Sequence, residues 1–195
     1  MLTDISAIFK SHIQLMTRVS EQLSPVLEEA GLVMSKALQD GKKILIMGNG
    51  GSAADSQHFV AELVGRFKYE RRALAAIALA DNSSTLTAVG NDYNFEAIFQ
   101  RQVEALANPG DIVIGISTSG QSKNVFLALQ QARNIGCVTF GLLGSDGGDI
   151  AAIVDTPIIV DSREAPRIQE AHITIIHILC ELIEEQMLTD KSDKK

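Results

Sequence analysis

Two side chains in the stretch GNGGSAADSQHFVAEL, residues 48–63, are of types that bind a metal ion or move a proton. His58 and Glu62 are four residues apart, so on a helix they share one face. In isolation this spacing is typical of a surface ion pair. Histidine and carboxylate are also ordinary ligands of zinc and ordinary acid–base groups, so the pair is a candidate for either chemistry.

The segment GNGGSAA precedes this pair and has the composition of an anion-binding turn. Glycines let the backbone come close to a ligand, and the free N–H groups at a helix start attract negative charge. The segment lacks the Lys-Ser/Thr of a nucleotide-triphosphate loop, and its glycine spacing differs from the dinucleotide fingerprint. The alternative is a tight turn in which Ser52 caps the helix.

A second loop, ISTSGQSKNV at residues 116–125, is rich in hydroxyl groups. Neutral hydroxyls together with N–H groups at a helix start suit a phosphate monoester, which accepts many hydrogen bonds. The alternative is a capped loop whose serines are solvated. The loop favours a small phosphorylated metabolite as ligand, and the hydroxyls belong to Ser117, Thr118, Ser119 and Ser122.

The C-terminal segment RIQEAHITIIHILCELIE carries polar residues on a mostly apolar helix. Gln169 and His177 are eight residues apart, which places them about 80° apart around a helix, so both can face one cavity. A single histidine on such a helix is also consistent with a core position. The other two histidines of helical segments, His12 and His172, are interpreted as core or interface residues.

Strand-like and helix-like segments alternate along the chain, which indicates an α/β fold with a parallel sheet covered on both faces. Glycine- and serine-rich turns follow the strands, and ligands of such sheets bind at the carboxyl ends of strands. The terminal helices are apolar on most of their circumference, which predicts a helical bundle between subunits. Strands are expected near 43–48, 75–80, 111–117, 137–143 and 156–161, and helices at 2–22, 24–40, 52–66, 84–107 (interrupted near Gly90), 122–135 and 165–188.

Composition narrows the classes of function. A chain of 195 residues suits one domain, and a net charge of −7 argues against nucleic acid as the main partner. No apolar run approaches the roughly 20 residues that span a bilayer, and the N-terminus has charges where a signal peptide would be apolar. Cys137 and Cys180 are interpreted as buried free thiols, which predicts a cytoplasmic location.

Five motifs in order, GNGGSAADSQHFVAEL with GRF, AVGNDYNFEAIF, GISTSGQS, LLGSDGG and RIQEAHITIIHIL, are similar to the phosphosugar-isomerase (SIS) family. The resemblance extends from the first helix to about Met187. It implies one domain with a flavodoxin-like sheet of five parallel strands, with a core at 31–188 and an oligomerisation segment at 1–30. It also implies a homotetramer with active sites between subunits.

The motifs are most similar to members that convert sedoheptulose 7-phosphate to D-glycero-D-manno-heptose 7-phosphate through an enediol. That reaction is the first step toward ADP-heptose for the lipopolysaccharide core. In such a mechanism Glu62 is the candidate to carry the carbon-bound proton, and His177 is the candidate for ring opening and proton transfer at oxygen. The resemblance implies a zinc ion held by His58, Glu62, Gln169 and His177.

The resemblance also implies which residues meet the substrate. The phosphate would lie against Ser117, Thr118, Ser119 and Ser122, and Arg66 would supply positive charge. Glu62 and Gln169 would face the substrate as well as the metal, and the sugar would contact Asn49, Gly50, Gly51, Asn91 and Asp92.

The sequence departs from the family pattern at two positions. Gln121 replaces an asparagine, which conserves a neutral amide, and Pro166 replaces an aspartate that could orient a catalytic group. A non-catalytic protein of the same fold, either a sugar-phosphate sensor or a protein that binds the replication initiator, is the alternative. The initiator-binding relatives lack the glutamate and the histidine found here at Glu62 and His177, so the sequence favours the enzyme.

Overall fold

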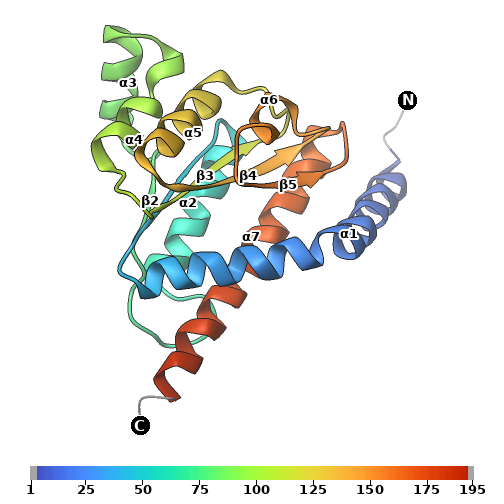
Figure 1. Ribbon diagram of the computed structural model, residues 1–195. Helices are drawn as coiled ribbons and strands as arrows, with labels where there is room; N and C mark the ends of the chain where they lie inside the picture. The colour runs from blue at the N-terminus through green and yellow to red at the C-terminus, as the bar shows by residue number, and fades with distance from the viewer. Residues whose placement is uncertain (1–3, 193–195) are drawn as a thin grey trace.

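The computed structural model describes residues 4–192, with the side chains described up to residue 189. Five strands form one parallel sheet in the order β2-β1-β3-β4-β5, which is the flavodoxin-like order (Figure 1). All five strands coincide with the strand-like runs of the sequence, so the predicted sheet is confirmed. Their bounds are β1 Ile44–Met47, β2 Ala76–Ala78, β3 Ile112–Ser117, β4 Val138–Gly144 and β5 Thr156–Val160.

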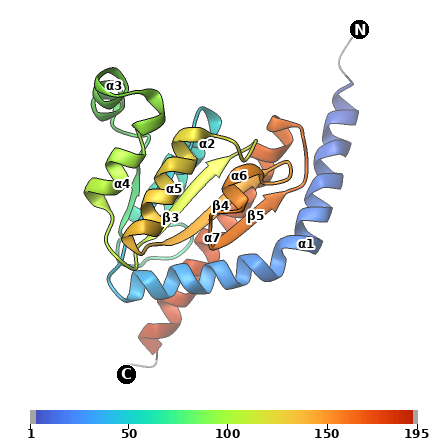
Figure 2. The same cartoon turned by 45° about the horizontal axis from the view of Figure 1, so that its top comes forward.

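Strands β1 and β3 are buried along their whole length, because helices cover both faces of the sheet (Figure 2). Side chains alternate between the faces, so Ile44 and Ile46 pack toward one helical layer and Leu45 and Met47 toward the other. The first layer consists of α1 Ile5–Gln39, α2 Gly51–Val64 and α7 Ala165–Ser192. The second contains α4 Gln100–Leu106, α5 Lys123–Ile135 and α6 Gly148–Ala151.

Helix α1 is one element of 35 residues, whereas the sequence suggested stretches at 2–22 and 24–40. Residues 2 and 3 lie outside the described part of the chain. Pro25 is inside the helix, and proline removes one backbone hydrogen bond and bends the axis. The helix is visibly bent in Figure 2, and its later part crosses α7. The expected division between residues 30 and 31 therefore falls within a continuous helix.

The helical segment expected at 84–107 is divided, but not at Gly90. Gly90 lies inside α3 Ser83–Asp92, and the break comes at residues 93 and 94, before the 3-10 turn η1 Phe95–Ala97. The reason is local: the side chain of Asn94 accepts a hydrogen bond of 2.9 Å from the N–H of Ala97 and so starts a new turn. Strand β2 is also shorter than expected, with three residues at the edge of the sheet.

Both cysteines are free and buried, as predicted. Burial raises the pKa of the Cys137 thiol to about 11 and that of Cys180 further, so neither is a reactive thiolate at neutral pH. Among the described residues, no helix has the length and apolar character to span a membrane.

His172 is a fully buried core residue of α7, as its apolar surroundings suggested. Its Nε2 lies 3.2 Å from the carbonyl of Leu143 and its Nδ1 has no partner, so the proton belongs on Nε2, which donates to the carbonyl. Burial lowers the pKa of His172 from 6.5 to about 4, despite the opposing effect of the Leu143 carbonyl.

This burial predicts a loss of stability in mild acid. The unfolded chain binds a proton at His172 below about pH 6.5, while the folded chain stays neutral there until about pH 4. The free energy of unfolding should therefore fall between pH 7 and pH 5 by about 2 kcal/mol more in the wild type than in His172→Gln. Urea unfolding of both proteins at pH 7 and pH 5 measures this difference. If the wild type and His172→Gln lost the same free energy of unfolding, His172 would not be held neutral by burial.

Candidate functional site

The loops that follow β1 and β3 lie side by side, because these two strands are neighbours in the sheet. Asn49, after β1, and Asn124, in the first turn of α5, exchange two side-chain hydrogen bonds of 2.9 Å each. Asn124 Oδ1 also accepts the N–H of Val125. The reciprocal amide pair fixes the glycine loop against the serine loop, at the point where the strand order reverses and where ligands of such sheets bind.

Three hydroxyls of the serine loop converge on one another. Ser117 Oγ is 2.9 Å from Ser122 Oγ and 3.4 Å from Ser119 Oγ. Ser122 occupies the cap position of α5, yet its side chain makes no capping hydrogen bond. Ser122 therefore does not cap α5 with its side chain, and its hydroxyl is directed to Ser117 within the cluster. The cluster offers donors that suit a phosphate at the start of α5.

A third loop supports the serine loop from behind. Gly120 has a positive φ of 66°, and its carbonyl accepts the N–H of Ile150 at 3.1 Å. A side chain at Gly120 would come within 2.1 Å of the carbonyl oxygen of Gly147, so the two loops are in backbone contact. The motif LLGSDGG thus acts as a structural support for the serine loop, and its glycines permit the close approach.

Helix α2 starts at the glycine loop and carries His58 and Glu62 along the surface of α7. His58 Nε2 lies 3.2 Å from Glu62 Oε1 and 3.0 Å from His177 Nε2 of α7. His58 and Glu62 are partly exposed, with side-chain exposures of 43% and 25%. The structure therefore brings together three of the predicted site residues, from two helices of the same chain, and leaves them open to a ligand.

Gln169, the fourth predicted ligand, lies apart from the His58, Glu62 and His177 group and packs against the start of α2. A side chain on Gly51 would come within 2.6 Å of the Gln169 amide nitrogen, so the amide packs directly on the glycine loop. Helix α7 thus contacts α2 at two points. Gln169 contacts the first residue of α2, and His177 contacts His58 further along α2. Ser52 is buried in the first turn of α2 and is not its cap, since Gly50 holds that position.

Three predicted substrate residues lie apart from these contacts in the single chain. Arg66 is exposed in the loop after α2. Asn91 and Asp92 are exposed at the end of α3 and hydrogen bond to each other at 2.9 Å. In the described chain none of the three forms a hydrogen bond or ion pair with the serine loop, His58, Glu62 or His177.

Two residues of the site were missed by the analysis of the sequence. Asn124 joins the two loops, and its position just inside α5 was a signal that could have been used. The ring of Phe67 stacks on the ring of His177, with centroids 5.6 Å apart and an interplanar angle of 25°. No spacing rule connects Phe67 with His177, because they come from different elements.

The two departures from the family pattern have local explanations. With its side-chain amide turned, Gln121 exchanges hydrogen bonds with Asp149 and so joins the serine loop to α6. Pro166 is the second residue of α7 and is exposed. Proline is well tolerated in the first turn of a helix, because the N–H it lacks has no partner there.

The chain is similar to known proteins along nearly its whole length. The SIS domain model matches residues 8–144. A phosphoheptose isomerase from Geotalea daltonii is 58% identical over 191 residues, which is 98% of this chain and 100% of the relative. The structure of a phosphoheptose isomerase from Neisseria gonorrhoeae superposes with a TM-score of 0.88 at 41% identity, over 93% of this chain and 97% of that one. One from Francisella tularensis gives 0.90 at 38%, over 93% and 96%.

Proposed function

The chain belongs to the SIS domain family, and we infer from this membership that it is a phosphoheptose isomerase like its most similar relatives. It is an enzyme that interconverts the aldose and ketose forms of a phosphorylated sugar, sedoheptulose 7-phosphate and D-glycero-D-manno-heptose 7-phosphate. The product serves ADP-heptose synthesis.

One observation carries this function. His58, Glu62 and His177 lie on the helices next to the glycine and serine loops, at the point between β1 and β3 where the strand order reverses. A non-catalytic sugar-phosphate binder needs only the loops. Here an acid–base pair of carboxylate and imidazole is placed on α2 and α7, directly after the glycine loop. This arrangement favours turnover over simple binding.

We assign the proton transfers to Glu62 and His177. The Glu62 carboxylate removes the proton from C1 of the ketose, while the C2 oxygen gains a proton and an enediol forms. The proton then returns to C2, and O1 loses its proton to give the aldehyde. The His177 imidazole moves the proton between O1 and O2 and assists opening of the sugar ring. Atoms balance, because the product is an isomer of the substrate.

The serine loop holds the phosphate at the other end of the sugar. Ser117, Ser119 and Ser122 supply hydroxyls, Thr118 lies between them, and the first turn of α5 supplies backbone N–H groups. Binding at this end positions C1 and C2 near Glu62, so part of the binding energy lowers the barrier to proton transfer. In this proposal Asn49, Gly50 and Gly51 meet the sugar hydroxyls.

Two further proposals concern the assembly and the location. We propose a homotetramer with sites at subunit interfaces, supported by the apolar residues Ile5, Phe9 and Ile13, which are 61–66% exposed on α1. A second subunit would bring Asn91 and Asp92 to a site from which they are distant in one chain. A cytoplasmic location stays a prediction that rests on the two buried free thiols.

The proposal that a zinc ion completes the site rests on the donor atoms present. Bonds of about 2.0–2.1 Å place the ligands of a tetrahedral zinc ion roughly 3.3 Å apart. His58 Nε2 is 3.0 and 3.2 Å from the donors of His177 and Glu62, which fits that spacing. Within residues 4–192 no group of three or more His, Cys, Asp or Glu side chains is arranged to hold a metal ion. The proposal therefore rests on the two distances from His58 and on Gln169 as the further ligand that the family resemblance implies. When bound, zinc supplies Lewis acidity toward the sugar oxygens.

Replacement of Glu62 by glutamine tests the function. The variant keeps the shape of the side chain but has no base, so kcat for sedoheptulose 7-phosphate should fall about 10²–10⁴-fold with KM nearly unchanged. Conversion is followed by the appearance of the aldose. Glu104→Gln, at an exposed carboxylate of α4 that pairs with Arg101, is the matched control and should behave as the wild type. A folded Glu62→Gln enzyme with wild-type kcat would show that the role is misassigned.

Removal of metal tests the zinc proposal separately. Dialysis against a chelator should remove about one zinc ion per chain, measured by mass spectrometry, together with the activity, and added zinc should restore both. His58→Ala should purify without zinc, while His12→Ala, outside the site, should retain it. Full activity of a protein free of metal would reject the proposal without affecting the assignment of the isomerase.

A further inference from the structure

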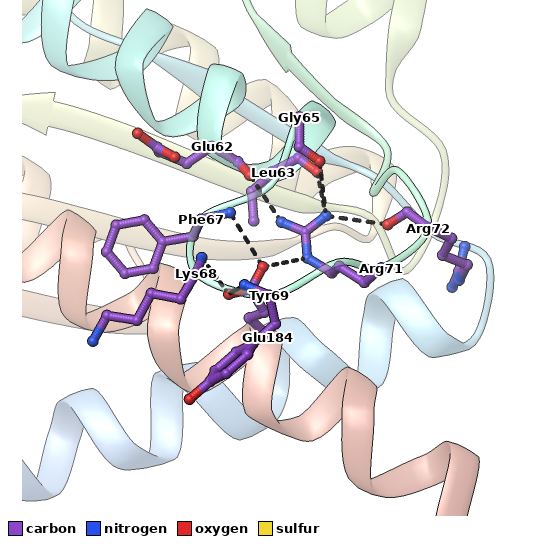
Figure 3. A network of polar contacts seen from close by, with 9 residues as sticks. All are labelled: Glu62, Leu63, Gly65, Phe67, Lys68, Tyr69, Arg71, Arg72 and Glu184. Atoms are coloured by element: carbon purple, nitrogen blue, oxygen red, sulfur yellow. Dashed lines mark hydrogen bonds and ion pairs between the residues drawn. The ribbon is translucent and has the colours of Figure 1, made fainter.

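A buried ion pair connects the end of α2 to α7 beneath the candidate site. Arg71 Nε lies 3.0 Å from Glu184 Oε1, and each side chain is only 1% exposed. Figure 3 shows the two at the centre of a network that includes the loop from Gly65 to Arg72. The segment RIQEAHITIIHILCELIE ends at Glu184, but the sequence assigns no chemistry to Glu184, and Arg71 lies outside every motif.

The Glu184 carboxylate organises the loop through the backbone. It accepts hydrogen bonds from the N–H groups of Phe67 (3.1 Å), Lys68 (2.7 Å) and Tyr69 (2.9 Å). Burial alone would raise the pKa of Glu184, but these bonds and the Arg71 guanidinium outweigh burial and hold the pKa below its ordinary value. The carboxylate therefore remains charged, and it fixes three consecutive residues of the loop.

The Arg71 guanidinium ties the same loop to α2. One terminal nitrogen donates to the carbonyl of Glu62 at 2.8 Å, and the other to that of Leu63 at 2.9 Å and, more weakly, to that of Gly65 at 3.4 Å. These are carbonyls at the end of α2 that lack partners within the helix. A positive charge at a helix C-terminus is favourable, and the planar fork of arginine contacts several carbonyls together. Arg71 thus holds the backbone of Glu62 itself.

The connection to the other catalytic residue runs through Phe67. His177 and Glu184 are seven residues apart on α7, almost two helical turns, so they share one face. Phe67 spans this distance, because its N–H binds Glu184 while its ring stacks on the ring of His177. Both residues assigned to proton transfer are therefore attached to one buried ion pair.

We propose that Arg71 and Glu184 are positioning residues of the isomerase, which act through the Glu62 backbone and through the Phe67 ring on His177. The inference rests on the proposed function. Neither residue touches the substrate loops. Disturbing the pair should therefore impair the chemical step while substrate binding by the serine loop is retained.

Three variants separate positioning from simple stability. Phe67→Leu removes the stacked ring but leaves the ion pair. Glu184→Gln keeps the ion-pair site filled but cannot accept all of its hydrogen bonds. Glu70→Gln is the matched control in the same loop, since the Glu70 side chain is exposed and takes no part in the hydrogen bonds of Arg71 and Glu184. For each, the melting temperature, kcat and KM for sedoheptulose 7-phosphate are measured at a temperature where all are folded.

Phe67→Leu should lower kcat about tenfold or more, with KM within about twofold and little change in melting temperature, since small misplacements of catalytic groups have large effects on rate. Glu184→Gln should lower both kcat and the melting temperature. Glu70→Gln should match the wild type in all three. Wild-type kcat in folded Phe67→Leu or in folded Glu184→Gln would overturn the proposal and leave the pair a purely structural role.

A readout without turnover keeps this inference distinct from the proposed function. The ring current of Phe67 shifts the carbon-bound protons of His177, and NMR of the histidine side chains detects the shift. In Glu184→Gln, which retains Phe67, the His177 signals should move toward those of Phe67→Leu. Unchanged His177 signals in Glu184→Gln would overturn the positioning role. A wild type that fails to convert the sugar, with these shifts as expected, would instead reject the assigned reaction.

Discussion

The pairing of β1 with β3 is the constraint on which the rest of the site depends. These strands are neighbours in space although β2 lies between them in sequence, so the loops at their carboxyl ends meet. Asn49 and Asn124 hold the two loops together through two side-chain hydrogen bonds, although they are 75 positions apart in the sequence. The glycine loop then opens α2 and the serine loop opens α5. Two helix starts therefore lie side by side, and in the proposed mechanism α2 extends the site from the phosphate to the reacting carbons.

The opposite wall of the site comes from α7, which crosses α2 in the same chain. Gln169 rests on Gly51, and His177 faces His58. The spacing of Gln169 and His177 predicts that both can face one cavity, and both contact α2, although at different points along it. The glycine loop and the pair of His58 and Glu62 are thus consecutive parts of one surface. In the proposed mechanism the loop receives the sugar, and His58 lies about two helical turns further along α2.

Much of this arrangement could be predicted from the sequence, because it depends on local patterns. Apolar runs located all five strands, and glycine- and serine-rich turns located both loops. Asn124 and Phe67 were missed because their roles depend on partners far along the chain: Asn49, and Glu184, which is 117 positions from Phe67. The break in the 84–107 segment falls three residues beyond Gly90, because Asn94 caps a new turn that begins at Phe95. Charge burial, as at Arg71 and Glu184, leaves no periodic signal in a sequence.

The central claim is that Glu62 moves a proton between two carbons through an enediol. Isomerisation of sedoheptulose 7-phosphate in D₂O tests it most directly. The Glu62 carboxylate is 25% exposed, so a proton held there exchanges with solvent before it returns to carbon. The account predicts a heptose 7-phosphate product with deuterium at C2, detected by mass spectrometry and by loss of the C2 proton signal. A product that stays free of deuterium after many reversible turnovers at equilibrium would contradict the account, because each passage through the carboxylate gives the proton another chance to exchange, whereas direct hydride transfer between C1 and C2 never introduces solvent deuterium.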